Sequence, residues 1–262
     1  MDLGIRDKVA LVCGASKGIA FATAVDLAKE GCRLAICSRD AASIHAAAKQ
    51  LEALGAPVLC LVADLSTDEG LATVIRETTV HYGEVDILIA NTGGPPTGPA
   101  MAHDWAAWTQ ASELLLRSVV ELTRAFVPGM RARGWGRVLC ITSKAVKEPV
   151  PSLVLSNSLR AAVTGYLRTL ANEVAADGIT VNTVLPGFTA TERLDALAEA
   201  TTKRTGTTRD AVYAGWIAQT PAGRLGRPEE LAATITFFAS DRAGFITGQA
   251  ILVDGGAVNA LL

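Results

Sequence analysis

The stretch K-V-A-L-V-C-G-A-S-K-G-I-A, from Lys8 to Ala20, decides the fold. Its apolar residues Val9 to Cys13 are typical of a strand buried in a parallel sheet, and a helical pattern follows from Phe21 to Lys29. Between them, Gly14 and Gly18 permit a tight turn and a close approach of the backbone to a ligand. The helix behind the turn begins with free N–H groups and the positive end of its dipole, which favour a pyrophosphate there.

Strand and helix patterns alternate along the rest of the chain. We expect further strands at Arg33–Ser38, Val58–Ala63, Val85–Ala90, Gly136–Thr142, Thr180–Leu185 and Ala250–Asp254, and helices at Ala41–Leu54, Thr67–Tyr82, Asp104–Arg133, Leu153–Ala176 and Pro228–Ser240. Repeated β-α-β units predict an α/β fold, a doubly wound, Rossmann-type parallel sheet with helices on both faces. Because no linker or repeat divides the chain, we expect a single domain over residues 1–262.

The carboxyl ends of parallel strands lie at one edge of a sheet, where ligands bind. The loops after Cys13, Ser38, Ala63, Ala90, Thr142 and Leu185 are therefore expected to share one crevice. Two helical stretches, around Leu114–Val127 and Leu153–Leu170, are apolar over more than one stripe. One sheet does not cover so many apolar faces, which favours a homo-oligomer, a dimer or a tetramer.

Composition argues against several classes of partner. The formal net charge is −2 and the pI is about 6.0, so neither nucleic acid nor an anionic membrane is expected. The N-terminus lacks a cationic-then-apolar signal, and no apolar run approaches the roughly 18 residues of a spanning helix. The five cysteines lack a C-x-x-C spacing and lie in or beside expected strands, which predicts free thiols and a cytoplasmic protein. The three histidines are scattered, and no metal site is expected.

Several motifs in order resemble the short-chain dehydrogenase/reductase family over nearly the whole chain. Gly14 to Ala20 resembles the family's G-x-x-x-G-x-G loop, with Ala20 in place of the third glycine. Asn91-Thr92-Gly93 resembles its N-A-G turn and Pro186 to Thr191 its P-G-x-x-x-T motif, while residues 223–230 and 246–256 resemble the β-ketoacyl-carrier-protein reductase branch. The resemblance implies an oxidoreductase of small molecules with a nicotinamide cofactor, in which residues 189–220 form a lid over the substrate.

The resemblance also implies which residues bind the cofactor. Asp64 would meet the adenine, Asn91 and Gly93 would line the cofactor, and the Pro186 to Thr191 motif would touch its nicotinamide half. The expected cofactor-binding residues are Gly14, Ser16, Lys17, Gly18, Ile19, Ser38, Arg39, Asp64, Leu65, Asn91, Gly93, Pro186, Gly187, Thr189 and Thr191.

The end of the second expected strand indicates the type of cofactor. An acidic residue there would bind the ribose hydroxyls of NAD(H) and repel a 2′-phosphate. This strand instead ends in Ser38-Arg39, and Lys17 lies in the first loop. Two cations near the ribose favour NADP(H) over NAD(H), the alternative being that both are solvated surface residues.

The catalytic positions depart from the family, which uses Asn, Ser, Tyr and Lys. Ser143 fits the serine at the end of the fifth strand, but Ser156 stands where the tyrosine is expected and Arg160 where the lysine is expected. Leu115 takes the asparagine position. An aliphatic hydroxyl ionises far above a phenol and a guanidinium stays charged, so this pair cannot exchange a proton as Tyr and Lys do.

Three functions fit this pattern, and we rank them in order. In the first, an altered oxidoreductase binds substrate through Ser143, Ser156 and Arg160, with a proton from water, Lys144 or Lys147. In the second, the chain is a catalytically inactive nucleotide-binding homologue that acts as a sensor or partner subunit. In the third, the pocket serves an elimination or aldol-type reaction with Arg160 holding a carboxylate. The polar pair at the family's spacing favours the first, whereas Leu115 is what loss of the site would leave.

Overall fold

The computed structural model describes residues 1–261, which contain one parallel seven-stranded sheet. Its strands are β1 (Val9–Cys13), β2 (Arg33–Ser38), β3 (Val58–Val62), β4 (Ile87–Ala90), β5 (Gly136–Ile141), β6 (Ile179–Pro186) and β7 (Ala250–Val253). The spatial order is β3-β2-β1-β4-β5-β6-β7, and every neighbouring pair is parallel. The strand order therefore reverses between β1 and β4, which places a ligand-binding crevice beyond their carboxyl ends.

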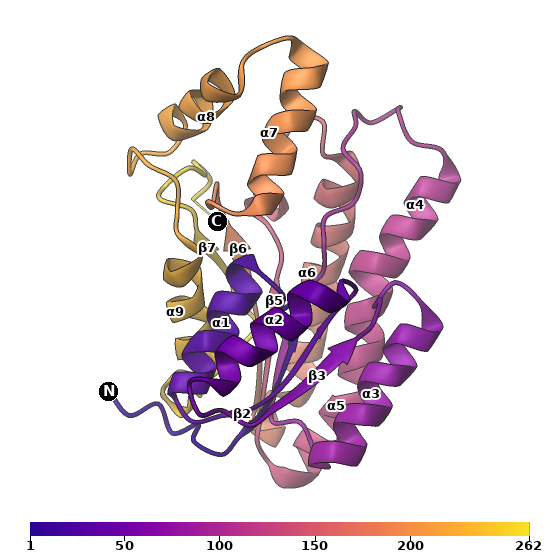
Figure 1. Cartoon of the computed structure of the whole chain (residues 1–262), viewed down its shortest axis with the longest axis vertical. Coiled ribbons are helices and arrows are strands. Elements are labelled where there is room, and N and C mark those ends of the chain that lie inside the picture. The colour runs from indigo at the N-terminus through magenta and orange to yellow at the C-terminus, as the bar shows by residue number, and fades with distance from the viewer. Residues whose placement is uncertain (262) are drawn as a thin grey trace.

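Helices cover both faces of the sheet (Figure 1). One face carries α1 (Gly18–Lys29), α2 (Ala41–Glu52) and α9 (Pro228–Phe238), and the other carries α3 (Asp68–Tyr82), α5 (Ser118–Arg133) and α6 (Val154–Val174). Alternate residues of β1 point to opposite faces of the sheet. Val12 therefore packs in the hydrophobic core under α1, α2 and α9, and Leu11 packs in the core under α3, α5 and α6. Both side chains are fully buried, as the continuous apolar run predicts for a strand covered on both sides. The doubly wound α/β prediction is confirmed.

The helix expected over residues 104–133 is not regular along its length. It consists of α4 (Trp105–Ser112), a π-helical turn at Glu113–Arg117, and α5. A π-helical turn inserts one extra residue and rotates the side chains that follow, a device common at functional sites. Here Leu114 lines the cleft at the carboxyl edge of the sheet, while Leu115 is buried in an apolar cluster that Leu114 also contacts.

Two further helices, α7 (Glu192–Thr205) and α8 (Arg209–Ala218), stand above the carboxyl edge of the sheet (Figure 1). The chain turns between them at Gly206, which has a φ of +73° and ends α7. Gly215 lies inside α8 and does not interrupt it. The Trp216 ring stacks on Phe188 with centroids 5.3 Å apart, which anchors α8 to the loop after β6.

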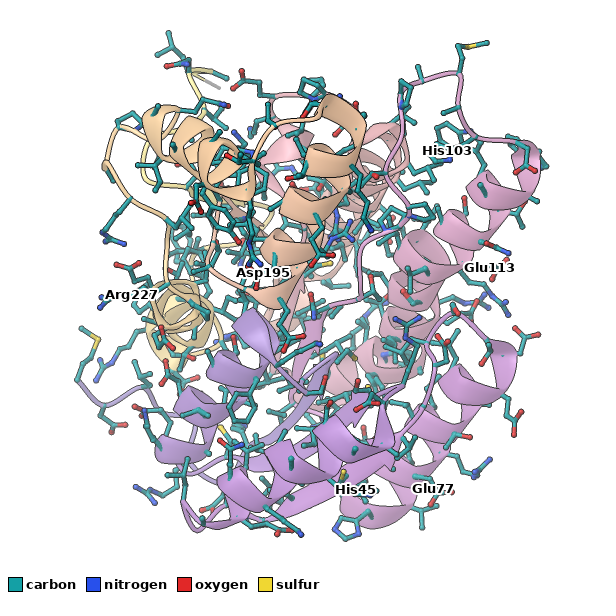
Figure 2. All side chains as sticks on the ribbon, turned by 45° about the horizontal axis from the view of Figure 1, so that its top comes forward. His45, Glu77, His103, Glu113, Asp195 and Arg227 are labelled. Carbon is teal, nitrogen blue, oxygen red and sulfur yellow. The ribbon has the colours of Figure 1, made fainter. Side chains whose placement is uncertain are left out.

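The described residues contain few features outside this architecture. Across residues 1–261, no helix combines the length and apolar character needed to cross a membrane. The same residues contain no group of three His, Cys, Asp or Glu side chains placed to hold a metal ion. His45 and His103 lie far apart (Figure 2). All five cysteines are free thiols.

Candidate functional site

A cleft of about 360 Å³ lies at the carboxyl ends of the strands. All of the expected cofactor-binding residues line it, from the loop after β1 to the loop after β6. Ser143, Ser156 and Arg160 line the same cleft, although they come from β5 and α6. The structure therefore brings every candidate residue of the sequence into one cavity.

The loop after β1 has a shape that only glycine allows at two positions. Gly14 and Gly18 both have a φ of +63°. A Cβ atom on Gly14 would lie 2.6 Å from Nδ2 of Asn91, so a side chain would also clash with the loop after β4. The Lys17 side chain does not cap α1, which leaves the first N–H groups of this helix facing the cleft. These features fit the pyrophosphate of a dinucleotide.

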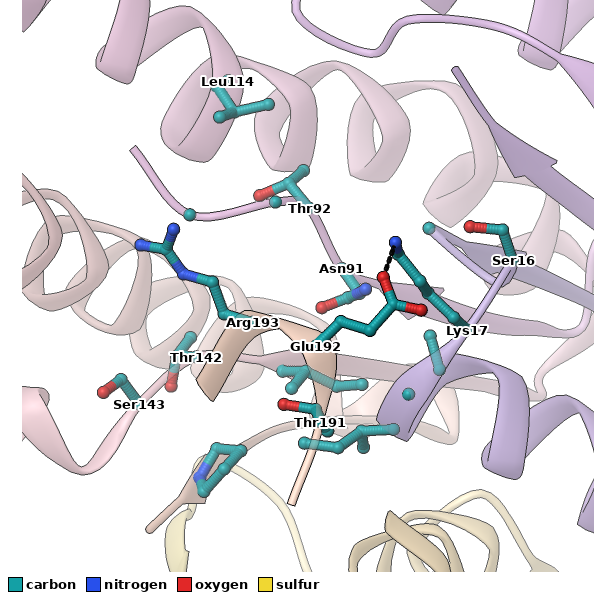
Figure 3. A pocket seen from close by; sticks show the side chains of 18 of the residues that line it. Ser16, Lys17, Asn91, Thr92, Leu114, Thr142, Ser143, Thr191, Glu192 and Arg193 are labelled. Atoms are coloured by element: carbon teal, nitrogen blue, oxygen red, sulfur yellow. Dashed lines mark hydrogen bonds and ion pairs between the residues drawn. The ribbon is translucent and has the colours of Figure 1, made fainter. Parts of the chain in front are cut away.

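Cations and hydroxyls gather at the end of β2. The hydroxyl groups of Ser38 and Ser16 lie 3.1 Å apart and join the strand to the glycine loop. Arg39 Nη1 lies 3.9 Å from a carboxylate oxygen of Asp64, and the Lys17 ammonium is paired with Glu192 on α7. Figure 3 shows the pair of Lys17 and Glu192 across the mouth of the cleft. Both cations are more than half exposed, so they can change partners when an anion enters.

Hydrogen bonds of ordinary length hold the three candidate catalytic residues in place. Ser156 is only 7% exposed, and its hydroxyl oxygen accepts a hydrogen bond of 3.1 Å from Nε of Arg160, one helical turn further along α6. Arg160 Nη1 donates to the carbonyl oxygen of Ile141, also at 3.1 Å. The hydroxyl oxygen of Ser143 accepts from the N–H of Ala145 at 3.1 Å. Each serine oxygen thus has one lone pair occupied and keeps its own hydrogen to donate.

Arg160 is a fixed positive charge. Burial lowers the pKa of its guanidinium to about 10, and the charge of Arg193 lowers it in the same direction, while Cys140 opposes the shift. Burial also raises the pKa of the Cys140 thiol to about 12, so that thiol is neutral at physiological pH. With a pKa near 10, Arg160 stays protonated at neutral pH and does not act as a proton carrier.

Two residues of α7 that line the cleft were not predicted from the sequence. Glu192 and Arg193 directly follow the P-G-x-x-x-T motif, where a helix begins. Arg193 Nη2 donates a hydrogen bond of 3.1 Å to the carbonyl oxygen of Pro95 in the loop after β4. This contact links α7 to a loop almost a hundred positions earlier in the chain. Only the folded chain shows that Arg193 faces the cleft.

The two lysines considered as proton donors lie outside the cleft. Lys144 is 8% exposed, and its ammonium sits 4.3 Å from the ring centroid of Phe188. Lys147 is exposed, and the chain around it forms only a short 3-10 turn after Ser143. Neither residue lines the cavity that holds Ser143 and Ser156. Of the donors considered from the sequence, water alone has direct access to the cleft.

The fold, the glycine loop and the order of the cleft residues define a known class of protein. A family model described as enoyl-(acyl carrier protein) reductase matches residues 14–258. The chain belongs to this family, the short-chain dehydrogenase/reductases.

Individual relatives are reductases. The 3-oxoacyl-[acyl-carrier-protein] reductase of Vibrio cholerae is 34% identical over 254 residues, which are 97% of this chain and 98% of that protein. The crystal structure of L-sorbose reductase from Gluconobacter frateurii, complexed with NADPH and L-sorbose, is similar with a TM-score of 0.93, 35% identity and full coverage of both chains. YwfH, an NADPH-dependent reductase involved in bacilysin biosynthesis, has a TM-score of 0.92 at 28% identity and covers 97% of this chain and 100% of its own.

Proposed function

We propose that this protein is an NADP(H)-dependent oxidoreductase of carbonyl or alcohol compounds in which Ser143, Ser156 and Arg160 form the substrate-binding site. One observation carries the proposal: these three residues line the cavity that also contains the glycine loop and the N-terminus of α1. A dinucleotide seated on that loop would extend along the cleft toward the two serines. Family membership supports the reaction class.

The preference for NADP(H) rests on charge at the end of β2. Arg39 and Lys17 both line the cleft there, next to the hydroxyl of Ser38. Asp64, the acidic group close to Arg39, accepts hydrogen bonds from the N–H and hydroxyl of Ser66. Two mobile cations fit a 2′-phosphate better than two ribose hydroxyls. NADPH in the complex of the sorbose reductase supports the same choice.

When bound, the nicotinamide supplies or accepts the hydride. Ser143 and Ser156 donate hydrogen bonds to the carbonyl oxygen of the substrate, because each hydroxyl accepts one hydrogen bond from the protein and keeps its own hydrogen to donate. Arg160 fixes the Ser156 hydroxyl in this orientation and adds a positive charge near the oxygen that becomes negative. In the reducing direction the carbonyl carbon gains the hydride and the oxygen gains a proton from water.

A second candidate function is a catalytically inactive nucleotide-binding homologue. Leu115 stands at the family's asparagine position, is 3% exposed and packs with Leu155 and Leu159. Among the described residues that line the cleft there is no tyrosine or histidine, and Lys17 is the one lysine. A site without a tyrosine, histidine or lysine beside the two serines would bind the cofactor without rapid turnover.

One experiment separates these functions. The purified protein is titrated with NADPH and with NADH by fluorescence, and NADPH consumption is then followed against a panel of ketones, enones and keto acids. We expect NADPH to bind at least ten-fold more tightly than NADH, and Arg39→Ala to reduce the difference while Arg76→Ala, an exposed cation on α3, does not. Lack of binding of either nucleotide would overturn the oxidoreductase proposal. Tight binding without consumption of any panel member would favour the inactive homologue.

Two further expectations from the sequence remain proposals: a segment that covers the substrate, and a homo-oligomer. We propose that residues 189–220 cover the substrate, since α7 brings Leu194 and Leu197 into the cleft. We also propose a homo-oligomer, because α6 leaves Ala161, Ala162 and Gly165 exposed on its outer face. Light scattering after size exclusion tests the second proposal, and a mass near 27.2 kDa for the protein in solution would contradict it.

A further inference from the structure

Two arginines line the cleft without an acidic partner. Among residues 1–261, the ion pairs between side chains include neither Arg160 nor Arg193. Arg160 is half-buried and Arg193 is exposed, and partial loss of hydration lowers the pKa of each guanidinium. The other arginine at the cleft, Arg39, is largely exposed to water and lies close to Asp64. Arg160 and Arg193 therefore differ from it in lacking an acidic partner, and Arg160 is also half-buried.

The two guanidinium groups also have unused hydrogen-bond donors. A guanidinium carries five N–H donors. Arg160 uses Nε for Ser156 and Nη1 for Ile141, which leaves Nη2 without a protein acceptor among the described residues. Arg193 uses only Nη2, for the carbonyl oxygen of Pro95. Donors that face a cavity and lack a protein acceptor favour a ligand that supplies acceptors.

The electrostatics call for a negative charge between these residues. Arg193 is close enough for its charge to lower the pKa of Arg160, so the two cations repel each other. A cation that is partly removed from water without a counter-charge, as Arg160 is, destabilises a folded protein. An anion bound between them would relieve both the repulsion and the loss of hydration.

The phosphates of the cofactor do not explain this pair. The glycine loop and the N-terminus of α1 lie on the side of Lys17 and Glu192, whereas Arg193 points away from them toward the loop that contains Thr92 (Figure 3). Arg160 lies on α6 and is tied to the end of β5 through Ile141. Both arginines thus belong to the part of the cleft that holds Ser143 and Ser156.

We infer that the substrate is an organic acid whose carboxylate is bound jointly by Arg160 and Arg193. This inference rests on the proposed function and adds the chemical class of the substrate to it. The planar fork of a guanidinium matches the two oxygens of a carboxylate. Leucine side chains at positions 114, 153 and 197 line the same cleft, so the body of the acid is apolar. The carbonyl that reacts then lies near the two serine hydroxyls.

The test is a binding measurement that needs no turnover. With NADP⁺ at saturation, calorimetry measures the affinity of 3-phenylpropionate and of its neutral amide, 3-phenylpropionamide. We expect the acid to bind at least ten-fold more tightly than the amide. Arg160→Gln and Arg193→Gln should each weaken binding of the acid about ten-fold and binding of the amide by at most about two-fold, because each removes hydrogen bonds that the charge of the acid strengthens. Arg204→Gln, at an exposed position near the end of α7, is the matched control and should change neither affinity.

Each outcome has a defined meaning. Equal affinities for acid and amide, lack of binding of the acid, or an acid affinity that the Arg160 and Arg193 variants leave unchanged would overturn the inference. If NADPH still binds in that case, the oxidoreductase proposal survives without its acidic substrate. If NADPH itself does not bind, the proposed function fails first. Should Arg160→Gln not fold, Arg193→Gln carries the test, since Arg193 makes one hydrogen bond at the surface of the cleft.

Discussion

The two halves of the cleft follow different rules. The nucleotide half, as we propose it, consists of the loops after β1, β2 and β3 and the N-terminus of α1, and it keeps the glycines and cations expected of its family. The substrate half, also a proposal, consists of Ser143, Ser156, Arg160, Arg193 and Leu114, and three of the family's four catalytic residue types are missing from it. The glycine turn sets the backbone of the first half, whereas side chains from separate elements make up the second. A fold can therefore keep its cofactor seat while its reaction site changes.

The largest expected effect comes from restoring the family's residues in the substrate half. In the triple variant Leu115→Asn, Ser156→Tyr and Arg160→Lys, a phenol next to an ammonium can donate and recover a proton. We expect NADPH-dependent reduction of a neutral ketone such as ethyl acetoacetate to become about 10²–10⁴-fold faster than in the unmodified protein. The same triple with Ser156→Phe lacks the hydroxyl and serves as the control.

One result would contradict the expected gain in the rate of ketone reduction. A folded triple variant that binds NADPH and reduces the ketone no faster than the Ser156→Phe control would show that the substrate half differs in shape as well as in proton chemistry. The buried Leu115 makes this a strict test, since Leu155 and Leu159 must accept an amide beside them.

In the nucleotide half, Gly18→Asp should weaken NADPH binding on the order of 100-fold. The new carboxylate would lie at the N-terminus of α1, where it would repel the pyrophosphate. The aspartate would also have to adopt the φ of +63° that Gly18 has, which is strained for a residue with a Cβ atom. Gly55→Asp introduces the same residue at a φ of +85° in a turn with open space around it. That control should lose a similar amount of stability and keep its NADPH affinity in a fluorescence titration. Equal affinities for the two variants would contradict the assignment of the cofactor seat.

A smaller effect is expected where α7 meets the nucleotide half. Glu192→Gln removes the carboxylate of α7 that pairs with the Lys17 ammonium. We expect the ammonium then to pair with the phosphate of the bound cofactor. Because both side chains are largely exposed, the pair is weak and NADPH affinity should rise only about two- to five-fold. Glu199→Gln, on the same helix and outside the cleft, is the control. An unchanged affinity in Glu192→Gln would place the 2′-phosphate away from Lys17.

The smallest effect concerns pH and a contact outside both halves. Arg224 and the N–H of Arg227 hold the pKa of Glu230 down to about 2, compared with 4.5 in the unfolded chain. The stability that this carboxylate contributes is complete above pH 4.5 and is lost as the pH falls toward 2. Glu230→Gln should therefore lower the Tm by about 2 °C at pH 7. The difference should shrink as the pH approaches 2, and a constant difference across this range would contradict the pairing.

The motif G-R-L-G-R-P-E-E, at residues 223–230, illustrates what the sequence could and could not reveal. Its resemblance to the ketoreductase branch was visible, but its role was not. In the structure Gly226 pairs with Thr189, and its carbonyl accepts a hydrogen bond from the N–H of Ala190. The motif thus supports the loop after β6, beside the substrate half. No spacing rule predicts a contact between segments so far apart in the chain.

The sequence by itself determined the sheet and the order of its elements, and it predicted the residues of the nucleotide half, because these depend on local signals. Apolar runs, helix periodicity and glycines at positive φ act within a few residues of one another. Only the tertiary structure decided the substrate half. Arg193 reaches Pro95, Arg160 reaches Ile141, and Leu115 packs with Leu155 and Leu159 of α6. These relations depend on how distant helices pack over the carboxyl edge of the sheet, and packing is a property of the whole fold.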